Sequence, residues 1–364
     1  MPRHTRARVR LDALRYNFRV ARTLAPESYS MAVVKADGYG HGLEAVARAL
    51  VRETNCLAVA TIDEASRIRA AGLGADVVLL EGVHEAADWH LVARQRLEPV
   101  LHSPHQLDGV GALAWDKPVS VWIKCNTGMN RLGVEGDDVE AMVLRIRDTP
   151  GLVLRGLLTH FACADDPADP MTPEQTGRMR SISRAFPELT VSAANSAAHF
   201  HSSDCHFGWT RPGIMLYGAT PLIGQNGPNL ALKPVMRLES RIVAVRVLSP
   251  GETVGYGATW RAAERTRMGV VEIGYGDGYP RHAPNGTPVA VEGVRCELIG
   301  RVSMDLIAVN LEGCPDAGAG SQVELWGEQV SVDEVAQLAG TISYELLTAV
   351  SSRVPRVHEG IDDI

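Results

Sequence analysis

The stretch MAVVKADGYGHG, residues 31–42, decides the fold. It begins with a short apolar run rich in β-branched side chains, which predicts a buried strand over residues 31–35. The run ends on Lys35, and three glycines follow by residue 42, which indicates a tight backbone turn. A buried ammonium group is costly without a partner. We therefore expect Lys35 to have a chemical role at the end of its strand.

Seven further apolar runs follow this one, and amphipathic segments of helical length separate them. This alternation is typical of βα units around a parallel sheet, and eight strands predict a closed TIM-type (β/α) barrel in the α/β class. A helix pattern over residues 11–24 precedes the first strand. The eight predicted strands are MAVVK (31–35), CLAVA (56–60), DVVLLE (76–81), LEPVLH (97–102), VSVWIKCN (119–126), LRGLLTHF (154–161), LTVSAAN (189–195) and HFGWTRP (206–212).

The pattern changes near residue 225 to long β-branched runs that glycine and proline interrupt, which predicts a second, mostly antiparallel β domain. Helix patterns return only at SVDEVAQLAG and TISYELLTAVSS, before an extended RVPRVHE. We predict a barrel over residues 8–224 and a C-terminal β domain over residues 225–364. The N-terminal strand, residues 1–7, is expected to join the second domain.

Composition excludes several classes of function. The 364 residues include 36 Lys and Arg against 43 Asp and Glu, so no basic face for nucleic acid is expected. No signal peptide or membrane-length apolar run is recognisable, which predicts a cytoplasmic protein. The six cysteines form no C-x-x-C pair, and HFHSSDCHF lacks zinc spacing, so we predict neither disulfides nor a metal site.

The ends of the predicted strands carry the candidate catalytic groups, because the carboxyl ends of barrel strands meet at one open face. Four cations and one histidine at this rim predict an anionic ligand. The residues at or just beyond the strand ends are Lys35, Lys124, Arg131, His160, Asn195, Ser196 and Arg211.

A phosphate is the anion that these loops suit best. In such barrels the loops after the seventh and eighth strands bind phosphate, and here they offer the Ser196 hydroxyl and the N–H groups near Gly213 and Ile214. Lysine forms a Schiff base with an aldehyde when it is desolvated. Phosphate, aldehyde and lysine together indicate pyridoxal 5'-phosphate.

Nine motifs in order then make the chain resemble the bacterial alanine racemases. They are AVVKADGYGHG, KCNTGMNRLG, LLTHFACAD, AANSAA, RPGIMLYG, VGYGATW, IGYGDGYPR, IGRVSMD and ISYELLT with RVPR. The resemblance implies a pyridoxal-phosphate-dependent isomerase that interconverts L- and D-alanine, for peptidoglycan synthesis or for alanine catabolism. It also implies a homodimer in which the β domain of one chain completes the active site of the other.

Two bases on opposite faces of the substrate follow from the resemblance. Lys35 matches the residue that holds the cofactor as a Schiff base and acts on the D-face, and Tyr256 of the partner subunit matches the base on the L-face. A tyrosine is a base only as the phenolate, and its ordinary pKa of about 10 requires positive charge or hydrogen-bond donors nearby. His160 and Arg211 match the residues that supply them.

Arg211 also matches the partner of the cofactor's ring nitrogen. An arginine stays protonated and can only donate to an unprotonated nitrogen, so electron withdrawal by the ring is limited and racemisation is favoured over decarboxylation or transamination.

The resemblance implies roles for the remaining candidates. Arg131 and Met304 match ligands of the substrate carboxylate, and Lys124 matches a lysine that is often carbamylated and orients Arg131. The other cofactor ligands are Tyr39, Asn195, Ser196, Gly213, Ile214 and Tyr344. The residues that line the substrate entrance are Asp165, Tyr275, Arg281, Arg301 and Asp305.

Three alternatives remain at this point. A cofactor-carrying barrel would lack the β domain and Tyr256, and a decarboxylase of the same fold would need an acid where this chain has Arg211. A racemase of broader specificity, acting on serine, shares all of these motifs.

Overall fold

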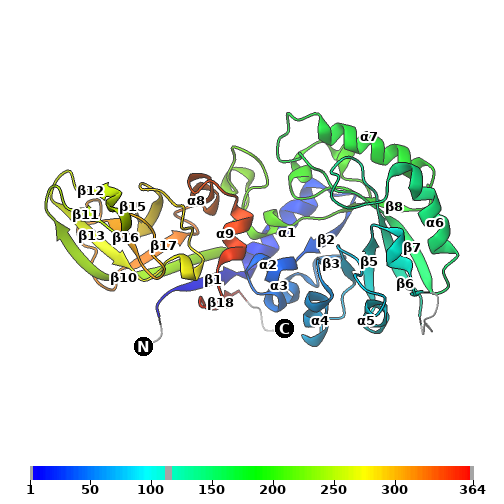
Figure 1. Cartoon of the computed structure of the whole chain (residues 1–364), viewed down its shortest axis with the longest axis horizontal. Coiled ribbons are helices and arrows are strands. Elements are labelled where there is room, and N and C mark those ends of the chain that lie inside the picture. The colour runs from blue at the N-terminus through cyan, green and yellow to red at the C-terminus, as the bar shows by residue number, and fades with distance from the viewer. Residues whose placement is uncertain (1–2, 111–116, 361–364) are drawn as a thin grey trace.

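The computed structural model describes residues 3–110 and 117–360. A helix-covered barrel forms one end of an elongated molecule and a β domain forms the other, with helix α9 between them (Figure 1). This arrangement confirms the predicted fold class.

The barrel is closed by eight parallel strands that pair in chain order. All eight predicted strands are confirmed, although most are shorter than their apolar runs. The strands are β2 (Tyr29–Val33), β3 (Cys56–Val59), β4 (Val77–Leu79), β5 (Leu97–Leu101), β6 (Val119–Lys124), β7 (Leu152–Leu158), β8 (Thr190–Ser192) and β9 (Trp209–Thr210).

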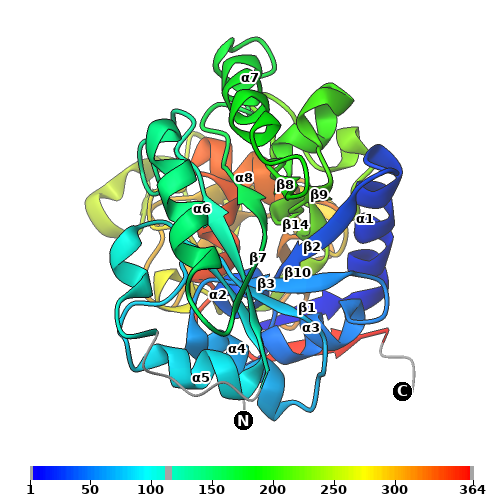
Figure 2. The same cartoon turned by 90° about the vertical axis from the view of Figure 1, so that its right-hand side faces the viewer.

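Burial on both faces explains why these strands are continuous apolar runs. Every residue of β3, β4 and β5 is buried, because side chains fill the barrel on one face and meet the outer helices on the other. Viewed from the barrel end, the helices surround the strands (Figure 2). The α-helices of the barrel domain are α1 (Leu11–Leu24), α2 (Lys35–Tyr39), α3 (Leu43–Leu50), α4 (Ile62–Ala70), α5 (Asp88–Gln95), α6 (Val139–Arg147) and α7 (Met171–Arg184).

Helices α4 and α7 begin in different ways. Helix α4 begins with a capping box. The Thr61 hydroxyl accepts a hydrogen bond from the Glu64 N–H, and the Glu64 carboxylate accepts one from the Thr61 N–H. Helix α7 begins at Met171 with Pro170 as its N-cap, and no side-chain hydrogen bond caps it. Helix α1 has the bounds that its amphipathic pattern predicts.

The second domain is built on one mostly antiparallel sheet. Its strand order is β13-β16-β15-β14-β17-β10-β1-β18, and β10 also pairs with β13. The strands are β1 (Arg6–Arg10), β10 (Met236–Leu248), β13 (Thr266–Val271), β14 (Pro288–Val291), β15 (Val294–Ile299), β16 (Ile307–Asn310), β17 (Gln322–Trp326) and β18 (Arg356–Glu359), and a separate hairpin is formed by β11 (Thr253–Val254) and β12 (Trp260–Arg261).

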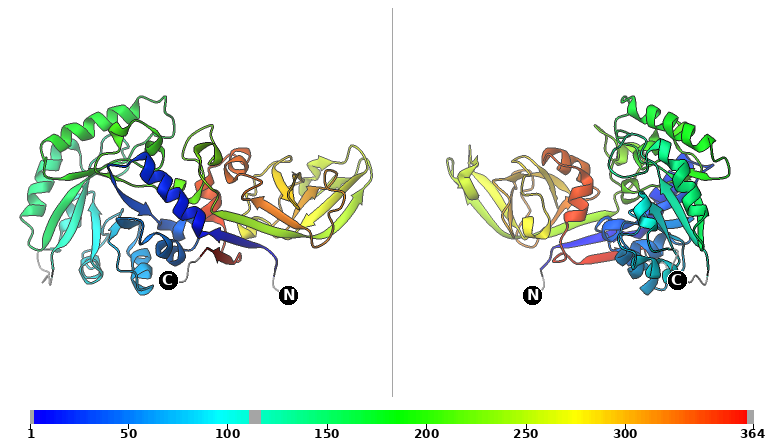
Figure 3. Two further views of the ribbon diagram at one scale, coloured as in Figure 1. Left: turned by 180° about the vertical axis from the view of Figure 1, so that it is seen from behind. Right: turned by 45° about the vertical axis from the view of Figure 1, so that its right-hand side comes forward.

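The first and last strands of the chain bind this sheet to the barrel. β1 pairs antiparallel with β10 and parallel with β18, and it leads directly into α1 of the barrel (Figure 3). Helices α8 (Val332–Leu338) and α9 (Ser343–Ala349) add a second link. The Asp333 carboxylate on α8 accepts hydrogen bonds from the N–H groups of Thr220 and Gly227. No helix among the described residues is long and apolar enough to cross a bilayer.

Candidate active site

A cavity of about 910 Å³ opens at the carboxyl ends of the barrel strands. It gathers candidates that are scattered over 300 positions of the sequence. The predicted residues that line it are Lys35, Tyr39, Lys124, Arg131, His160, Asn195, Ser196, Arg211, Gly213, Ile214 and Tyr344.

Lys35 stands at the start of a left-handed turn. β2 spans Tyr29–Val33, so the predicted strand over residues 31–35 has the right length but lies two residues too far along the chain. Ala36, Asp37, Gly38 and Tyr39 all have positive φ, between 51° and 61°, a conformation that costs an L-residue about 1–2 kcal/mol. The turn brings the half-buried Lys35 and the buried Tyr39 to the same cavity.

Hydrogen bonds from two other residues hold this strained turn. The Ala36 N–H donates to the Glu64 carboxylate over 2.6 Å. His41 Nδ1 lies 2.8 Å from the Tyr39 carbonyl oxygen and 3.0 Å from that of Gly38. Burial lowers the pKa of His41 to about 4, so the ring is neutral and Nδ1 must carry its proton to donate here. His41, for which the sequence indicated no role, therefore stabilises the turn after Lys35.

The ring of Tyr39 is fixed by aromatic neighbours. It stacks on Tyr217 with centroids 4.6 Å apart, and His41 packs against Tyr217 at 4.7 Å. The Tyr217 hydroxyl donates to the Val33 carbonyl oxygen. These contacts limit the positions that the Tyr39 hydroxyl can take.

Backbone and hydroxyl groups form a cradle beyond the ends of β8 and β9, next to β2, which pairs with β9. Ser196 Oγ accepts hydrogen bonds from the N–H groups of Gly213, at 2.7 Å, and Met215, at 3.4 Å. Its own proton is therefore free to be donated into the cavity. A Cβ on Gly213 would lie 2.6 Å from the Tyr39 hydroxyl, so only glycine allows this close approach.

Arg211 is a buried cation held by neutral acceptors. Its Nη groups donate to Ser192 Oγ at 2.6 Å, to the Thr159 carbonyl at 2.6 Å and to the Ala193 carbonyl at 3.0 Å. Burial lowers the pKa of Arg211 to about 9, which leaves it protonated at neutral pH. Within the described residues these bonds use the Nη groups alone, so the Nε–H is available to a ligand.

His160 is held in one tautomer. Its Nδ1 lies 3.2 Å from Arg211 Nη2, and because a guanidinium only donates, Nδ1 accepts and Nε2 carries the proton. Burial and the nearby cations lower the pKa of His160 well below its ordinary value. A neutral imidazole therefore presents an N–H donor at the cavity.

Lys124 is the most heavily buried of the lysines at this rim. It is 8% exposed, and burial, with Arg211, Arg131 and Lys35 nearby, lowers its pKa to about 8. Glu81 also lines the cavity, and its negative charge acts in the opposite direction by raising the pKa of Lys124. We did not predict a role for Glu81, although it ends the apolar run DVVLLE and the position alone could have indicated it.

The other predicted residues do not line this cavity. Tyr256 is 69% exposed and Met304 is 53% exposed, and both belong to the β domain. They lie in a second exposed cluster, in which the Tyr275 N–H donates to the Ser303 carbonyl and the Gly276 N–H donates to that of Met304. A Cβ added at Gly257 would lie 3.1 Å from Arg301 Nη1. The Arg301 guanidinium therefore packs against the turn that contains Gly257.

The remaining entrance candidates are exposed as well. Asp305 in the second cluster accepts a hydrogen bond from Arg353 at 2.6 Å, and Arg281 follows the turn that contains Tyr275. Asp165 belongs instead to the barrel, where its charge acts on the phenol of Tyr344 at the cavity.

Comparison with known proteins gives one consistent family. Residues 9–221 match the family description "Alanine racemase, N-terminal domain" and residues 235–358 match "Alanine racemase, C-terminal domain". An alanine racemase of Marinobacter nauticus is 53% identical over 361 residues, covering 99% of this chain and all of that protein. The biosynthetic alanine racemase of Pseudomonas aeruginosa is 45% identical over 351 residues, 96% of this chain and 98% of that one.

Solved structures agree over the whole chain. The crystal structure of the biosynthetic alanine racemase of Pseudomonas aeruginosa superposes with a TM-score of 0.94 at 44% identity, covering 99% of this chain and 100% of that one. Alanine racemase of Bartonella henselae with covalently bound pyridoxal phosphate has a TM-score of 0.88 at 27% identity, covering 98% and 100%.

Proposed function

The chain belongs to the alanine racemase family, and we propose that it interconverts L- and D-alanine with Lys35 and Tyr256 as its two bases. The observation that carries the proposal is one cavity lined by Lys35, Lys124, Arg131 and Arg211 together with the Ser196 cradle. This donor set suits an anionic cofactor and an amino-acid carboxylate together.

The residues of the cavity fit pyridoxal 5'-phosphate. The Ser196 hydroxyl proton and the Arg211 Nε–H are available as donors to a phosphate and a pyridine nitrogen, and the close packing of Gly213 against Tyr39 brings the Tyr39 hydroxyl to the same cradle. When bound, the cofactor supplies a conjugated ring that accepts the electron pair left by removal of the α-proton. Lys35 is the amine available for its covalent attachment.

The protein residues then hold and move the proton. Inversion at the α-carbon requires a base on each face, and we assign one face to Lys35 and the other to Tyr256 of the partner subunit. The Nε2–H of His160 is a suitable donor to a phenolate, because Arg211 fixes the opposite nitrogen as an acceptor. Arg131 pairs with the substrate carboxylate, and this contact orients the α-hydrogen.

A homodimer is part of the proposal. Tyr256 and Met304 are exposed and belong to the β domain, while Lys35 lines the barrel cavity. A second copy of the chain would bring the exposed cluster over the cavity and complete it.

Mixing two inactive variants tests the shared site. Lys35→Ala and Tyr256→Phe should each abolish racemisation, and a mixture should recover up to about a quarter of the wild-type activity, because half of the chains form mixed dimers with one intact site. D-alanine is measured by chiral chromatography after incubation with L-alanine and cofactor, and the same assay on serine tests substrate breadth. No recovery, although mass spectrometry shows mixed dimers, would contradict the shared site.

The role of Tyr256 needs a separate readout. Tyr256→Phe should suppress exchange of the α-hydrogen of L-alanine with deuterium and leave the cofactor absorbance unchanged. Equal losses of exchange and cofactor binding would make Tyr256 structural.

We further propose a biosynthetic role in the cytoplasm, which supplies D-alanine for peptidoglycan. The support is the biosynthetic enzyme among the relatives. The gene should restore growth of a D-alanine auxotroph without added D-alanine, and failure of an expressed, active enzyme to do so would contradict this role.

We also propose that the Lys124 amine is carbamylated. A pKa of about 8 leaves about a tenth of such amines neutral at pH 7, and the carbamate is an anion able to pair with Arg131. Labelled bicarbonate should give a carbamate NMR signal that Lys124→Met removes.

A further inference from the structure

Gln175 is a fully buried amide in the middle of α7, outside the cavity. It contacts the two loops that carry Arg131 and His160. Nothing in the sequence pattern indicated a role for it, since a glutamine within a polar helix is ordinary.

Every polar atom of the Gln175 amide has a partner. Nε2 donates one proton to Thr127 Oγ1, at 3.1 Å, and the other to the His160 carbonyl, at 3.0 Å. Oε1 accepts from the Ala162 N–H at 2.9 Å. One side chain therefore fixes the loop after β6 relative to the segment after β7.

The contacts of Gln175 extend through Thr127 to Thr159, a residue that also binds Arg211. The Thr159 hydroxyl donates to the Cys125 carbonyl, so at 2.7 Å it must accept the proton of the Thr127 hydroxyl. The Thr159 carbonyl in turn accepts from Arg211. Thr159 therefore contacts the chain from Gln175 through its hydroxyl and Arg211 through its backbone carbonyl.

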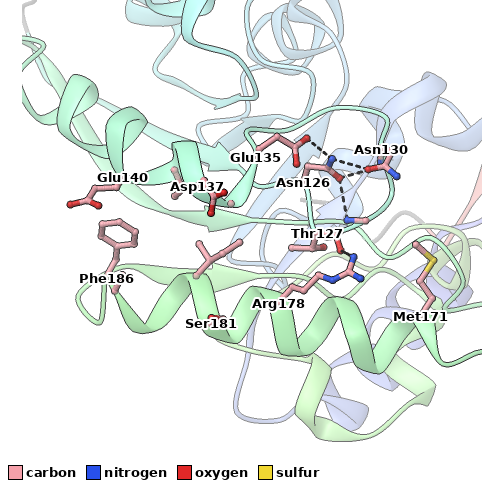
Figure 4. Close-up of a pocket in the computed structure, with 15 residues that line it drawn as sticks. Asn126, Thr127, Asn130, Glu135, Asp137, Glu140, Met171, Arg178, Ser181 and Phe186 are labelled. Carbon is pink, nitrogen blue, oxygen red and sulfur yellow. Dashed lines mark hydrogen bonds between the residues drawn. The ribbon is translucent and has the colours of Figure 1, made fainter.

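Arg178, one helical turn further along α7, holds the same loop from its outer side. Its Nη1 donates to the Thr127 carbonyl at 2.9 Å, and Figure 4 shows it reaching from the helix to Thr127 along a groove of about 810 Å³. Asn126 closes the loop by accepting from the N–H groups of Gly128 and Asn130. Arg131 follows directly on this anchored turn.

We propose that Gln175 is a positioning residue for the substrate carboxylate: by holding Thr127 and the His160 backbone, it sets where Arg131 stands. The inference rests on the proposed function, in which Arg131 binds the carboxylate. A misplaced Arg131 weakens binding of any carboxylate at this position, whereas attachment of the cofactor to Lys35 on the other side of the barrel is unaffected.

The test uses propionate, which has the carboxylate of alanine and no amine. In the dimeric holoenzyme, Gln175→Met should raise the inhibition constant of propionate and the KM for L-alanine roughly tenfold, with unchanged cofactor absorbance. Thr172→Val is the matched control: Thr172 is buried on the same helix, its hydroxyl has no partner among the described residues, and both constants should stay at the wild-type values. An unchanged propionate constant in Gln175→Met overturns the proposal.

A double-mutant cycle separates positioning from general loosening of the fold. If Gln175 acts through Arg131, Gln175→Met should add less than about twofold to the propionate constant in an Arg131→Lys background. Losses that multiply independently overturn the positioning role and leave the proposed function intact. If Arg131→Lys alone has no effect on propionate, the carboxylate role of Arg131 and the inference that rests on it both fail.

Arg178→Met provides a variant that does not alter the core, since the Arg178 side chain is 56% exposed. It should raise the propionate constant about threefold, because the loop keeps the bond from Gln175 and loses the second anchor. If Gln175→Met does not fold, no change in Arg178→Met overturns the proposal.

Discussion

Substitution of Gly40 by alanine should test how closely the turn after Lys35 packs against α9. Gly40 has a φ of +80°, and an added Cβ would lie 2.1 Å from the Leu347 carbonyl oxygen of α9. The left-handed conformation costs alanine about 1 kcal/mol. An ordinary contact is about 3.5 Å, so α9 must also move by roughly 1 Å, and such overpacking costs about 1–3 kcal/mol more.

Gly72 provides the matched control. It has a φ of +76°, but nothing lies within 4 Å of its added Cβ. Gly72→Ala should therefore lower the apparent free energy of unfolding by about 1 kcal/mol, and Gly40→Ala should lower it by about 3 kcal/mol.

Urea unfolding of the holoenzyme measures both, at equal chain and cofactor concentrations because both affect apparent stability. α9 also carries Tyr344, which lines the cavity, so a cofactor titration should show weaker binding in Gly40→Ala and unchanged binding in Gly72→Ala. Equal losses of stability in the two variants would refute the close approach, and normal cofactor affinity in Gly40→Ala would refute the link to α9.

Three further predictions concern the rim of the barrel. Burial lowers the pKa of Lys124 from 10.5 to about 8, so between these pH values the unfolded chain binds one more proton than the folded chain. The free energy of unfolding should therefore rise from pH 8 to 10.5, by up to about 3 kcal/mol. In CO₂-free buffer Lys124→Met should flatten this rise, and an unchanged rise in the variant contradicts the assignment. Glu64→Ala removes the acceptor of the Ala36 N–H and the capping box and should cost about 1–2 kcal/mol in urea unfolding, which an unchanged midpoint would disprove. Arg211→Lys keeps the charge, but a lysine cannot reach the same acceptors. Thermal unfolding should therefore show a free energy of unfolding lower by about 2–4 kcal/mol, and an unaltered melting curve would argue against the hydrogen bonds of the Arg211 guanidinium.

Local sequence was enough to predict the architecture. The barrel strands are largely buried, β3, β4 and β5 completely, and are therefore mainly apolar runs, so all eight strands could be found without their partners. Strand ends were less reliable, because the backbone at Lys35 turns left-handed for reasons that lie in Glu64 and His41. The contact of the Ala36 N–H with Glu64 joins distant parts of the chain, and no local rule predicts it.

The residues of the candidate site also include some that local sequence predicts and some that it does not. Lys35, Lys124 and Arg211 could be predicted because each ends or closely follows an apolar run, and barrel topology brings such ends to one rim. Gln175 was missed, since its importance depends on contacts with Thr127, His160 and Ala162 in other elements, whereas the position of Glu81 at the end of its apolar run could have indicated it.

The sequence by itself determined the succession of strands, the two-domain composition and the residue types at the barrel rim, because burial and backbone preference act over a few neighbouring residues. Only the tertiary structure decided which protons are held where: the neutral His41 and His160, the lowered pKa of Lys124 and the spare donors of Ser196 and Arg211. All of these properties depend on burial, and those of His160, Ser196 and Arg211 also depend on hydrogen-bond partners in other elements. Neither the burial nor these partners exist until the barrel has closed.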